Sequence, residues 1–322
     1  PVIVLSSGNG LWNTGVWPGW GMGADITLNW AAAGVRVVKQ CPVKCRFTND
    51  QAAIPGAAAV IMELINHDKF LGTAVAEDTP IPWPARKPGS ALPLFGNFFF
   101  EPRGVFPRYT SSAEVVANVD FTIAPGHADV PVTLTCPWGG SPEDYLKPAP
   151  PKAPGHAIAF FNEHGIAGEY AEFIEEFARI MGDDFHAYGQ MANRPVPEEA
   201  GGNPYQLATR LQFLGTYKFH LVTEFTIEDD WIEGELSQTF LSGSVPIYLG
   251  SPNVLDHAPG EHSVISVRDF SGPADLAHYV RALLEDDTRY NTYFDWKAKG
   301  LAPRFSQHLD NCVHYAECRI CK

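Results

Sequence analysis

The strongest constraint on the fold is the stretch Tyr217–Gly250, YKFHLVTEFTIEDDWIEGELSQTFLSGSVPIYLG. Residues 217–225 alternate and are rich in β-forming side chains, which predicts a strand. Apolar residues at helical spacing over 233–242 predict a short helix with one buried face. Gly243 is typical of a helix C-terminus, and 244–249 is a compact apolar run that predicts a second buried strand. A strand, a helix and a strand in this order form a right-handed βαβ unit.

The turn inside this unit is acidic, with Glu224 near the end of the first strand and Glu228, Asp229 and Asp230 after it. Ligands of open α/β sheets bind outside the carboxyl ends of the strands, so we expect Glu224 to Asp230 to lie at that edge. Asp229 and Asp230 could hold a divalent cation, although acidic pairs in turns are more often solvated. The sequence therefore predicts a ligand-binding edge and requires no metal site.

The length and charge of the chain narrow the classes of protein it fits. Its 322 residues are enough for two domains of ordinary size. The formal net charge of −14 argues against nucleic-acid binding, because a phosphate backbone requires a basic surface. No apolar run approaches the roughly 20 residues needed to span a bilayer. We therefore expect a two-domain globular chain, with any membrane anchor outside this sequence.

A proline-rich segment divides the chain. KPAPPKAPG at 147–155 is typical of a stiff, extended linker. We predict an N-terminal α/β domain at 1–147, the linker at 148–155, a second α/β domain at 156–300 and a cysteine-rich tail at 301–322.

The cysteines allow two interpretations. There are six: Cys41, Cys45, Cys136, Cys312, Cys318 and Cys321. The pairs 41/45 and 318/321 could form a zinc site, but that spacing is imperfect and two cysteines would be left over. An even number with clusters near both ends suits disulfide bonds in an oxidising compartment, and six cysteines permit 15 pairings among which sequence cannot choose.

The central unit resembles the donor-binding segment of the α1,3-fucosyltransferases, especially their plant-type branch. In that family the segment reads Tyr-Lys-Phe, then Phe-Glu-Asn-Ser, then Thr-Glu-Lys, and ends in Gly-Ser-Val-Pro. The residues in step with it are Tyr217, Lys218, Phe219, Glu224, Asp229, Asp230, Trp231, Gln238, Gly243, Ser244, Val245, Pro246 and Gly250. Upstream, an apolar run over 92–100 ends in Glu101-Pro102, similar to a family strand that ends in Glu-Ser-Pro.

The resemblance implies a fold and a reaction. The fold would be α/β and GT-B-like, with two Rossmann-like domains facing each other across a cleft. Glu101 would be the catalytic base on the acceptor side, and fucose would pass from GDP-fucose to a glycan hydroxyl with inversion. The implied donor-binding residues are Glu224, Asp230 and Trp231, with Lys218 and His164 as candidate cations.

The chain departs from the family at residues that would contact the donor. The family's Thr-Glu-Lys falls on Glu233, Gly234 and Glu235, so an anion replaces a phosphate-binding cation. Like charges about 4 Å apart cost on the order of 4 kcal/mol at an intermediate dielectric. The loop 162–168 also lacks the family's arginine. Lys218, Arg210, Arg194 or a metal ion at Asp229 and Asp230 would have to supply the missing charge.

Three functional hypotheses follow from the resemblance and these departures. In the first, the chain is an active fucosyltransferase-like enzyme, with a nucleotide sugar and a glycan acceptor as partners; Mn²⁺ is compatible with the sequence but not required by it. In the second, it is a glycosyltransferase with a changed donor or acceptor. In the third, it is a catalytically inactive relative that serves as a structural or binding subunit with protein partners. The resemblance also implies the Golgi lumen, a type II membrane protein whose anchor is outside this chain, and it favours disulfides over zinc.

Overall fold

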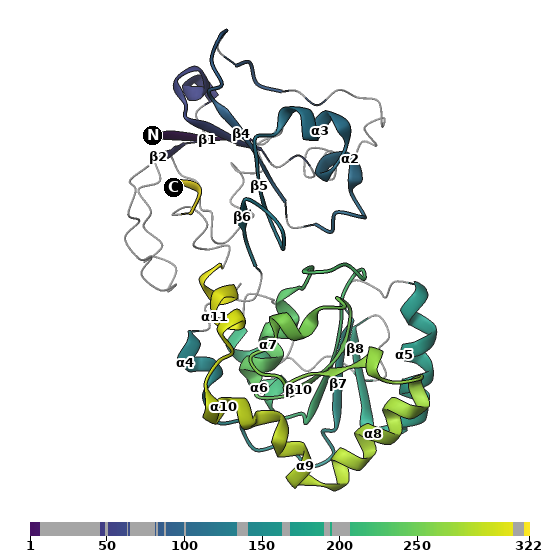
Figure 1. Ribbon diagram of the computed structural model, residues 1–322. Coiled ribbons are helices and arrows are strands. Elements are labelled where there is room, and N and C mark those ends of the chain that lie inside the picture. The colour runs from purple at the N-terminus through teal and green to yellow at the C-terminus, as the bar shows by residue number, and fades with distance from the viewer. Residues whose placement is uncertain are drawn as a thin grey trace. The chain divides into compact units, whose positions relative to one another are not determined.

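The chain forms two compact units, each built on one parallel sheet with helices (Figure 1). The first unit is Pro1–Thr133 with Asn311–Lys322, and the second is Leu134–Asp310. The structure, a computed structural model, describes residues 1–6, 46–48, 51–62, 64, 81, 83–86, 88–99, 101–133, 141–162, 168–189, 194, 207–311 and 319–322. Two parallel α/β units in one chain agree with the predicted α/β, GT-B-like fold class.

The first unit contains a six-stranded parallel sheet in the order β2-β1-β3-β4-β5-β6. Its strands are β1 Val2–Ser6, β2 Arg46–Thr48, β3 Ala59–Met62, β4 Leu94–Phe98, β5 Phe121–Ala124 and β6 Val130–Pro131; its helices are η3 Gln51–Gly56, α2 Pro107–Thr110 and α3 Ala113–Asn118. Val60, Phe95 and Phe99 lie in its core. Strands β3 and β4 are buried almost throughout, as expected for parallel strands inside an α/β unit.

The second unit contains a five-stranded parallel sheet in the order β11-β10-β9-β7-β8. Its strands are β7 Ile158–Asn162, β8 Phe185–Gly189, β9 Phe219–Thr223, β10 Val245–Leu249 and β11 Ile265–Ser266. Its α-helices are α4 Pro142–Tyr145, α5 Gly168–Met181, α6 Leu207–Gly215, α7 Gly234–Ser242, α8 Pro273–Glu285, α9 Asp287–Asn291, α10 Asp295–Lys299 and α11 Pro303–Asp310. Short 3₁₀ turns are η4 Gly182–Asp184, η5 Val254–His257, η6 Val267–Asp269 and η7 Thr292–Phe294.

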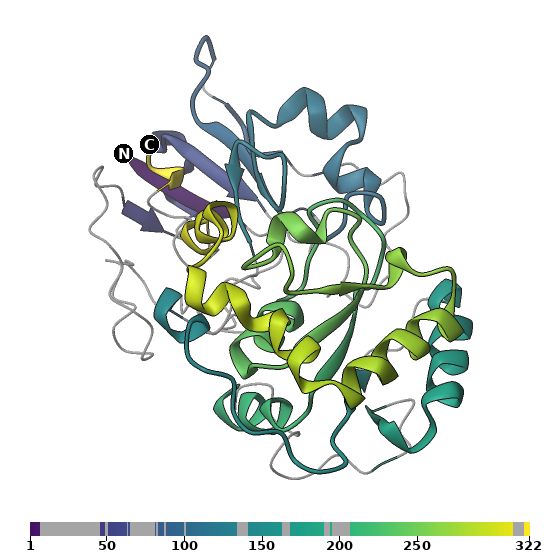
Figure 2. The ribbon, with the colours of Figure 1, turned by 60° about the horizontal axis from the view of Figure 1, so that its bottom comes forward.

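Helices cover both faces of this second sheet (Figure 1, Figure 2). Helix α5 packs beside α8, and α6 packs beside α7. Alternate residues of β7 belong to two different cores: Phe160 packs with α5 and α8, whereas Phe161 packs with Leu214 of α6. This alternation follows from the two-residue period of a strand. The strand order reverses between β7 and β9, so this unit has a topological switch point there.

The predicted βαβ unit at 217–250 is confirmed as β9, α7 and β10. The two strands are parallel neighbours, with Val245 paired to Phe219. Helix α7 ends at Gly243, whose φ of 77° is left-handed and which donates its amide to Thr239 and Phe240 carbonyls. Glycine adopts this conformation without the cost that a Cβ would add.

The compact units differ from the predicted domain bounds. The proline-rich segment packs on the second unit: Lys152 Nζ donates to the carbonyl oxygens of Gly215 and Gly243, and Ala153 donates to Thr216. Helix α11 also belongs to the second unit, whereas residues 311–322 return to the first. Proline content indicates an extended backbone but does not reveal what that backbone packs against.

Within the described residues, no helix combines the length and apolarity needed to cross a membrane.

Candidate functional site

The carboxyl edge of the second sheet brings together the loops that follow β9 and β10. Glu224 is the first residue after β9, and Gly250 is the first after β10. The Glu224 amide donates to the Leu249 carbonyl at 3.0 Å, so the two strand ends lie side by side. A Cβ added at Gly250 would come within 2.2 Å of Glu224 Cγ, which explains why a glycine stands there. This is the edge that the sequence predicted for a ligand.

Glu224 is buried and holds the loop that follows it. Its side chain is only 3% exposed. Its Oε2 accepts the Glu233 amide at 3.0 Å, which closes the loop 224–233, and its Oε1 accepts the Tyr248 hydroxyl at 3.0 Å. Burial raises the pKa of the Glu224 carboxyl well above its ordinary value, and the charge of Glu233 adds to this. Both oxygens are bonded within the protein, so Glu224 positions the loop.

Asp230 links this loop to the turn η5. Its φ is 63°, a left-handed backbone that is uncommon outside glycine. Its amide donates to Asn253 Oδ1 at 2.9 Å, and Asn253 Nδ2 donates to Asp230 Oδ1 at 2.8 Å. His257 Nε2 lies 3.1 Å from the same oxygen. These reciprocal bonds select aspartate or a similarly short polar residue at this position.

Trp231 lies beneath the loop surface. It is 6% exposed, and its ring meets that of Phe225 at a centroid distance of 6.5 Å. Phe225 is 56% exposed and follows Glu224 directly. The buried indole therefore stabilises the loop, and Phe225 is the aromatic ring that this loop presents to solvent.

A charged cluster lies beside the loop, at the first turns of α6 and α7. Arg210 Nη2 is 3.1 Å from Glu235 Oε1, and their side chains are 15% and 18% exposed. His220 Nε2 is 3.4 Å from the same oxygen. Burial by itself raises the pKa of the Glu235 carboxyl, but His220 and Arg210 together outweigh burial and hold that pKa below its ordinary value. Glu235 is therefore an ionised carboxylate between two basic groups.

The tautomer of His220 follows from its partners. Its Nδ1 is 2.7 Å from the Thr239 hydroxyl. That hydroxyl donates to the Glu235 carbonyl oxygen at 2.9 Å, so it must accept from Nδ1–H. The other ring nitrogen, Nε2, faces the Glu235 carboxylate. The sequence analysis missed this histidine; strand alternation was the available signal, because it places His220 on the same face of the sheet as α7.

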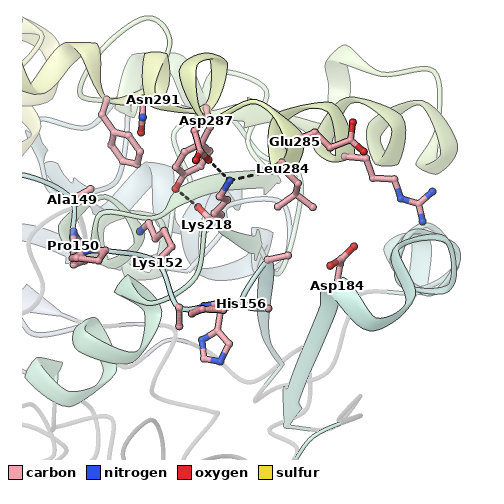
Figure 3. A pocket seen from close by; sticks show the side chains of 18 residues that line it. Ala149, Pro150, Lys152, His156, Asp184, Lys218, Leu284, Glu285, Asp287 and Asn291 are labelled. Carbon is pink, nitrogen blue, oxygen red and sulfur yellow. Dashed lines mark hydrogen bonds and ion pairs between the residues drawn. The ribbon is translucent and has the colours of Figure 1, made fainter.

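The structure does not bring Lys218 to this edge. Lys218 precedes β9, so it lies at the amino end of the strand, roughly 20 Å from Glu224 at the rise of a β-strand. Its Nζ contacts Asp287 Oδ1 at 2.6 Å and the Leu284 carbonyl at 3.2 Å. Lys218, Lys152 and Asp287 line a pocket of about 790 Å³ at this opposite edge (Figure 3). Lys218, which the sequence analysis offered as a donor-binding cation, therefore lies at the amino edge of the sheet, opposite the loop 224–233.

Glu101 lies in the first unit, three residues after β4 ends. It is partly buried, and it follows the carboxyl end of a strand, as the sequence predicted. The strand is shorter than the apolar run, because β4 covers 94–98. Its role as a base stays a prediction.

Several expected residues lie outside the described part of the chain: His164, Cys41, Cys45, Cys136, Cys312 and Cys318. Cys321 is described and is disulfide-bonded. The other predicted disulfide positions stay predictions. No group of three or more potential metal-binding side chains occurs among the residues that the structure describes.

Two α/β units in one chain, each built on one parallel sheet, fit the GT-B-like class of folds. The family model described as glycosyltransferase family 10 (fucosyltransferase), C-terminal, matches residues 154–322, more than half of the chain. The chain therefore belongs to the fucosyltransferases of glycosyltransferase family 10.

Curated relatives are similar to part of the chain. A Bos taurus GDP-fucose protein O-fucosyltransferase 3 is 40% identical over 117 residues, which cover 35% of this chain and 24% of that protein. The Xenopus laevis protein of the same name is 30% identical over 166 residues, covering 47% of this chain and 35% of its own length. The chain spans about a third or less of the length of these relatives. An α1,3-fucosyltransferase solved with GDP-fucose is 16% identical, with a TM-score of 0.46 over 72% of this chain and 80% of that one.

Proposed function

We propose that this chain carries the catalytic unit of an inverting fucosyltransferase that uses GDP-fucose. Family membership supports fucosyl transfer, and the curated relatives are named for GDP-fucose. The observation that carries the proposal is the loop 224–233, fixed at the carboxyl edge of the second sheet by Glu224 and Asp230. Open α/β sheets bind nucleotides at such an edge.

The proposed reaction assigns one proton transfer to the first unit. The Glu101 carboxylate takes the proton of the acceptor hydroxyl, and that oxygen attacks the anomeric carbon of fucose. The bond from this carbon to the phosphate oxygen breaks as the new bond forms on the opposite face, so the configuration inverts. GDP leaves with the bonding electron pair, and Glu101 later returns its proton to solvent. Glu224, Asp230 and Trp231 shape the donor loop.

The proposed acceptor is a hydroxyl group on a protein. The curated relatives are named protein O-fucosyltransferases, whereas the α1,3 resemblance alone implies a glycan hydroxyl. The two acceptor classes are distinguished by incubating the chain with GDP-fucose and either a secreted-protein domain or a free oligosaccharide. Fucose on the protein supports the proposal, and fucose only on the sugar contradicts this part of it. A secretory, Golgi-lumenal location belongs to the same proposal.

The decisive experiment compares the wild-type chain with Glu101→Gln. We expect GDP to bind both with micromolar affinity by calorimetry, with or without Mn²⁺, because Glu101 lies in the other unit from the donor loop. We expect the substitution to reduce transfer about 100-fold or more, the usual contribution of a general base. Glu143→Gln, a change at a glutamate outside the proposed site, is the control. Absence of GDP binding up to millimolar concentration rejects the proposal.

A second candidate is an inactive subunit that keeps the fold. The observation that favours it is the ionised Glu235 in the first turn of α7, where the resembling family has lysine. A carboxylate repels the donor phosphates unless a cation offsets it. Under this alternative, the chain binds neither GDP nor GDP-fucose, so the same calorimetry separates the two candidates.

A further inference from the structure

The short turn η5 supports the loop 224–233 through a histidine. Asn253 precedes this turn and His257 is its last residue, and both contact Asp230. His257 Nε2 lies 3.1 Å from Asp230 Oδ1, and the two side chains are only 5% and 15% exposed. A carboxylate oxygen accepts hydrogen bonds, so Nε2 carries a hydrogen and donates it. The loop therefore depends on the orientation of the His257 ring.

The His257 ring is held by a second histidine, on helix α11. The rings of His257 and His308 stack with their centroids 4.2 Å apart and their planes 17° apart. His308 Nε2 donates to the Asp256 carbonyl at 3.1 Å. Burial and the neighbouring His257 lower the pKa of His308 to about 4, so His308 is a neutral ring near pH 7. The stack thus avoids two facing positive charges.

Helix α11 contacts η5 at one further point. Arg304 Nη1 lies 2.7 Å from Asp256 Oδ1. Arg304 and His308 are four residues apart, so they lie on the same face of α11, and both contact Asp256. The loop 224–233 is therefore supported by η5, and η5 in turn is supported by α11.

The backbone at Asp230 makes the loop sensitive to this support. Its φ of 63° is left-handed, and a residue other than glycine keeps that conformation where surrounding contacts hold it. Asn253 supplies two bonds, to the Asp230 amide and carboxylate, and His257 supplies a further one. Without the histidine bond, the loop should populate more conformations. The apparent affinity of a ligand falls with the fraction of chains in the binding conformation.

We infer that His257 is a positioning residue for the nucleotide donor: by donating to Asp230, it holds the loop 224–233 in the conformation that binds the nucleotide. The His308 ring keeps His257 in the orientation that this bond requires. This inference rests on the proposed function, since it needs the donor to bind at the loop. His257 acts through Asp230, so its effect is on donor affinity.

Two substitutions separate the N–H donor of His257 from its ring. His257→Phe keeps a ring that can stack on His308 and removes the donor, whereas His257→Gln keeps a donor at similar reach and removes the ring. Calorimetry with GDP is performed on the full chain. We expect His257→Phe to weaken GDP binding about 10-fold and His257→Gln to weaken it less than about threefold. His262→Phe is the matched control, because His262 also stacks on an aromatic ring, at 4.0 Å from Tyr293. It should leave GDP affinity unchanged.

Amide hydrogen exchange measures the loop directly, without ligand. We expect peptides that cover 224–233 to exchange faster in His257→Phe than in wild type or His257→Gln, while the peptide that covers β9 keeps its protection. Faster exchange throughout the second unit contradicts the inference, because His257 then stabilises the unit as a whole.

A second variant keeps the test decisive if His257→Phe does not fold. His308→Ala removes the stacked ring at a partly buried position of α11, and we expect it to weaken GDP binding about threefold. GDP affinity that is unchanged in the folded variants overturns the inference and leaves the proposed function intact. Equal loss in His257→Phe and His257→Gln also overturns it, because the loss then follows ring packing. A wild-type chain that does not bind GDP overturns the proposed function and the inference together.

Discussion

At the scale of single residues, Glu224 determines how the loop 224–233 is held. Its carboxyl accepts bonds from the Glu233 amide and the Tyr248 hydroxyl in a site with almost no exposure. Sequence placed Glu224 at the end of a strand, which is where it lies. Sequence could not reveal its burial, because the hydroxyl that bonds it belongs to a residue 24 positions further along the chain.

The raised pKa of Glu224 makes a pH-dependent contribution to stability. A folded-state pKa above the unfolded value means that the folded chain binds the proton more tightly. The contribution is fully present below the ordinary carboxyl pKa and is lost as pH rises through the raised value. We compare wild type with Glu224→Gln by urea denaturation at several pH values. The difference between their free energies of unfolding should fall as pH rises through this range. A difference that does not change with pH would contradict the prediction.

At the scale of elements, the sequence predicted β9, α7 and β10 because each carries its own local signal. Buried β-forming runs mark the strands, and Gly243 marks the helix end. The proline-rich segment lacked such a signal for its packing, since the partners of Lys152 lie 63 and 91 residues away. Its composition predicted a stiff, extended connection between domains, and it did not reveal that Lys152 contacts Gly215 and Gly243.

Lys152 joins the C-terminal ends of α6 and α7. Its Nζ donates to the Gly215 carbonyl at 2.9 Å and to the Gly243 carbonyl at 2.6 Å, and a cation is favourable at such helix ends. We expect Lys152→Met to lower the free energy of unfolding by about 1–3 kcal/mol, because two buried carbonyl acceptors lose their donor. Lys147→Met is the control: its exposed ion pair with Asp144 should contribute less than about 1 kcal/mol. Equal effects in urea denaturation would show that Lys152 is not a structural cap.

At the scale of the whole molecule, sequence predicted two α/β domains but neither the strand orders nor the return of the chain end to the first unit. Strand order depends on which buried runs pair, and those runs are chemically alike. The return depends on contacts between distant segments: Thr133 donates to Asn311, and Arg319 donates to the Pro131 carbonyl and to the Asn311 carbonyl and side chain. These bonds tie Asn311 and Arg319 to the end of the first sheet.

The unit that Arg319 stabilises can be identified by calorimetric melting in the presence of GDP. If GDP binds at the proposed site on the loop 224–233, it should raise the transition of the second unit by mass action. We expect Arg319→Met to lower the transition of the first unit by about 3–6 °C, since two backbone carbonyls and the Asn311 side chain lose a charged donor. The GDP-responsive transition should keep its temperature. Arg268→Met, a change at an exposed residue of the second unit, is the control and should leave both transitions unchanged. If Arg319→Met lowered the GDP-responsive transition as much as the other, the chain end would stabilise the molecule as one cooperative unit, and the assignment of 311–322 to the first unit would not hold energetically.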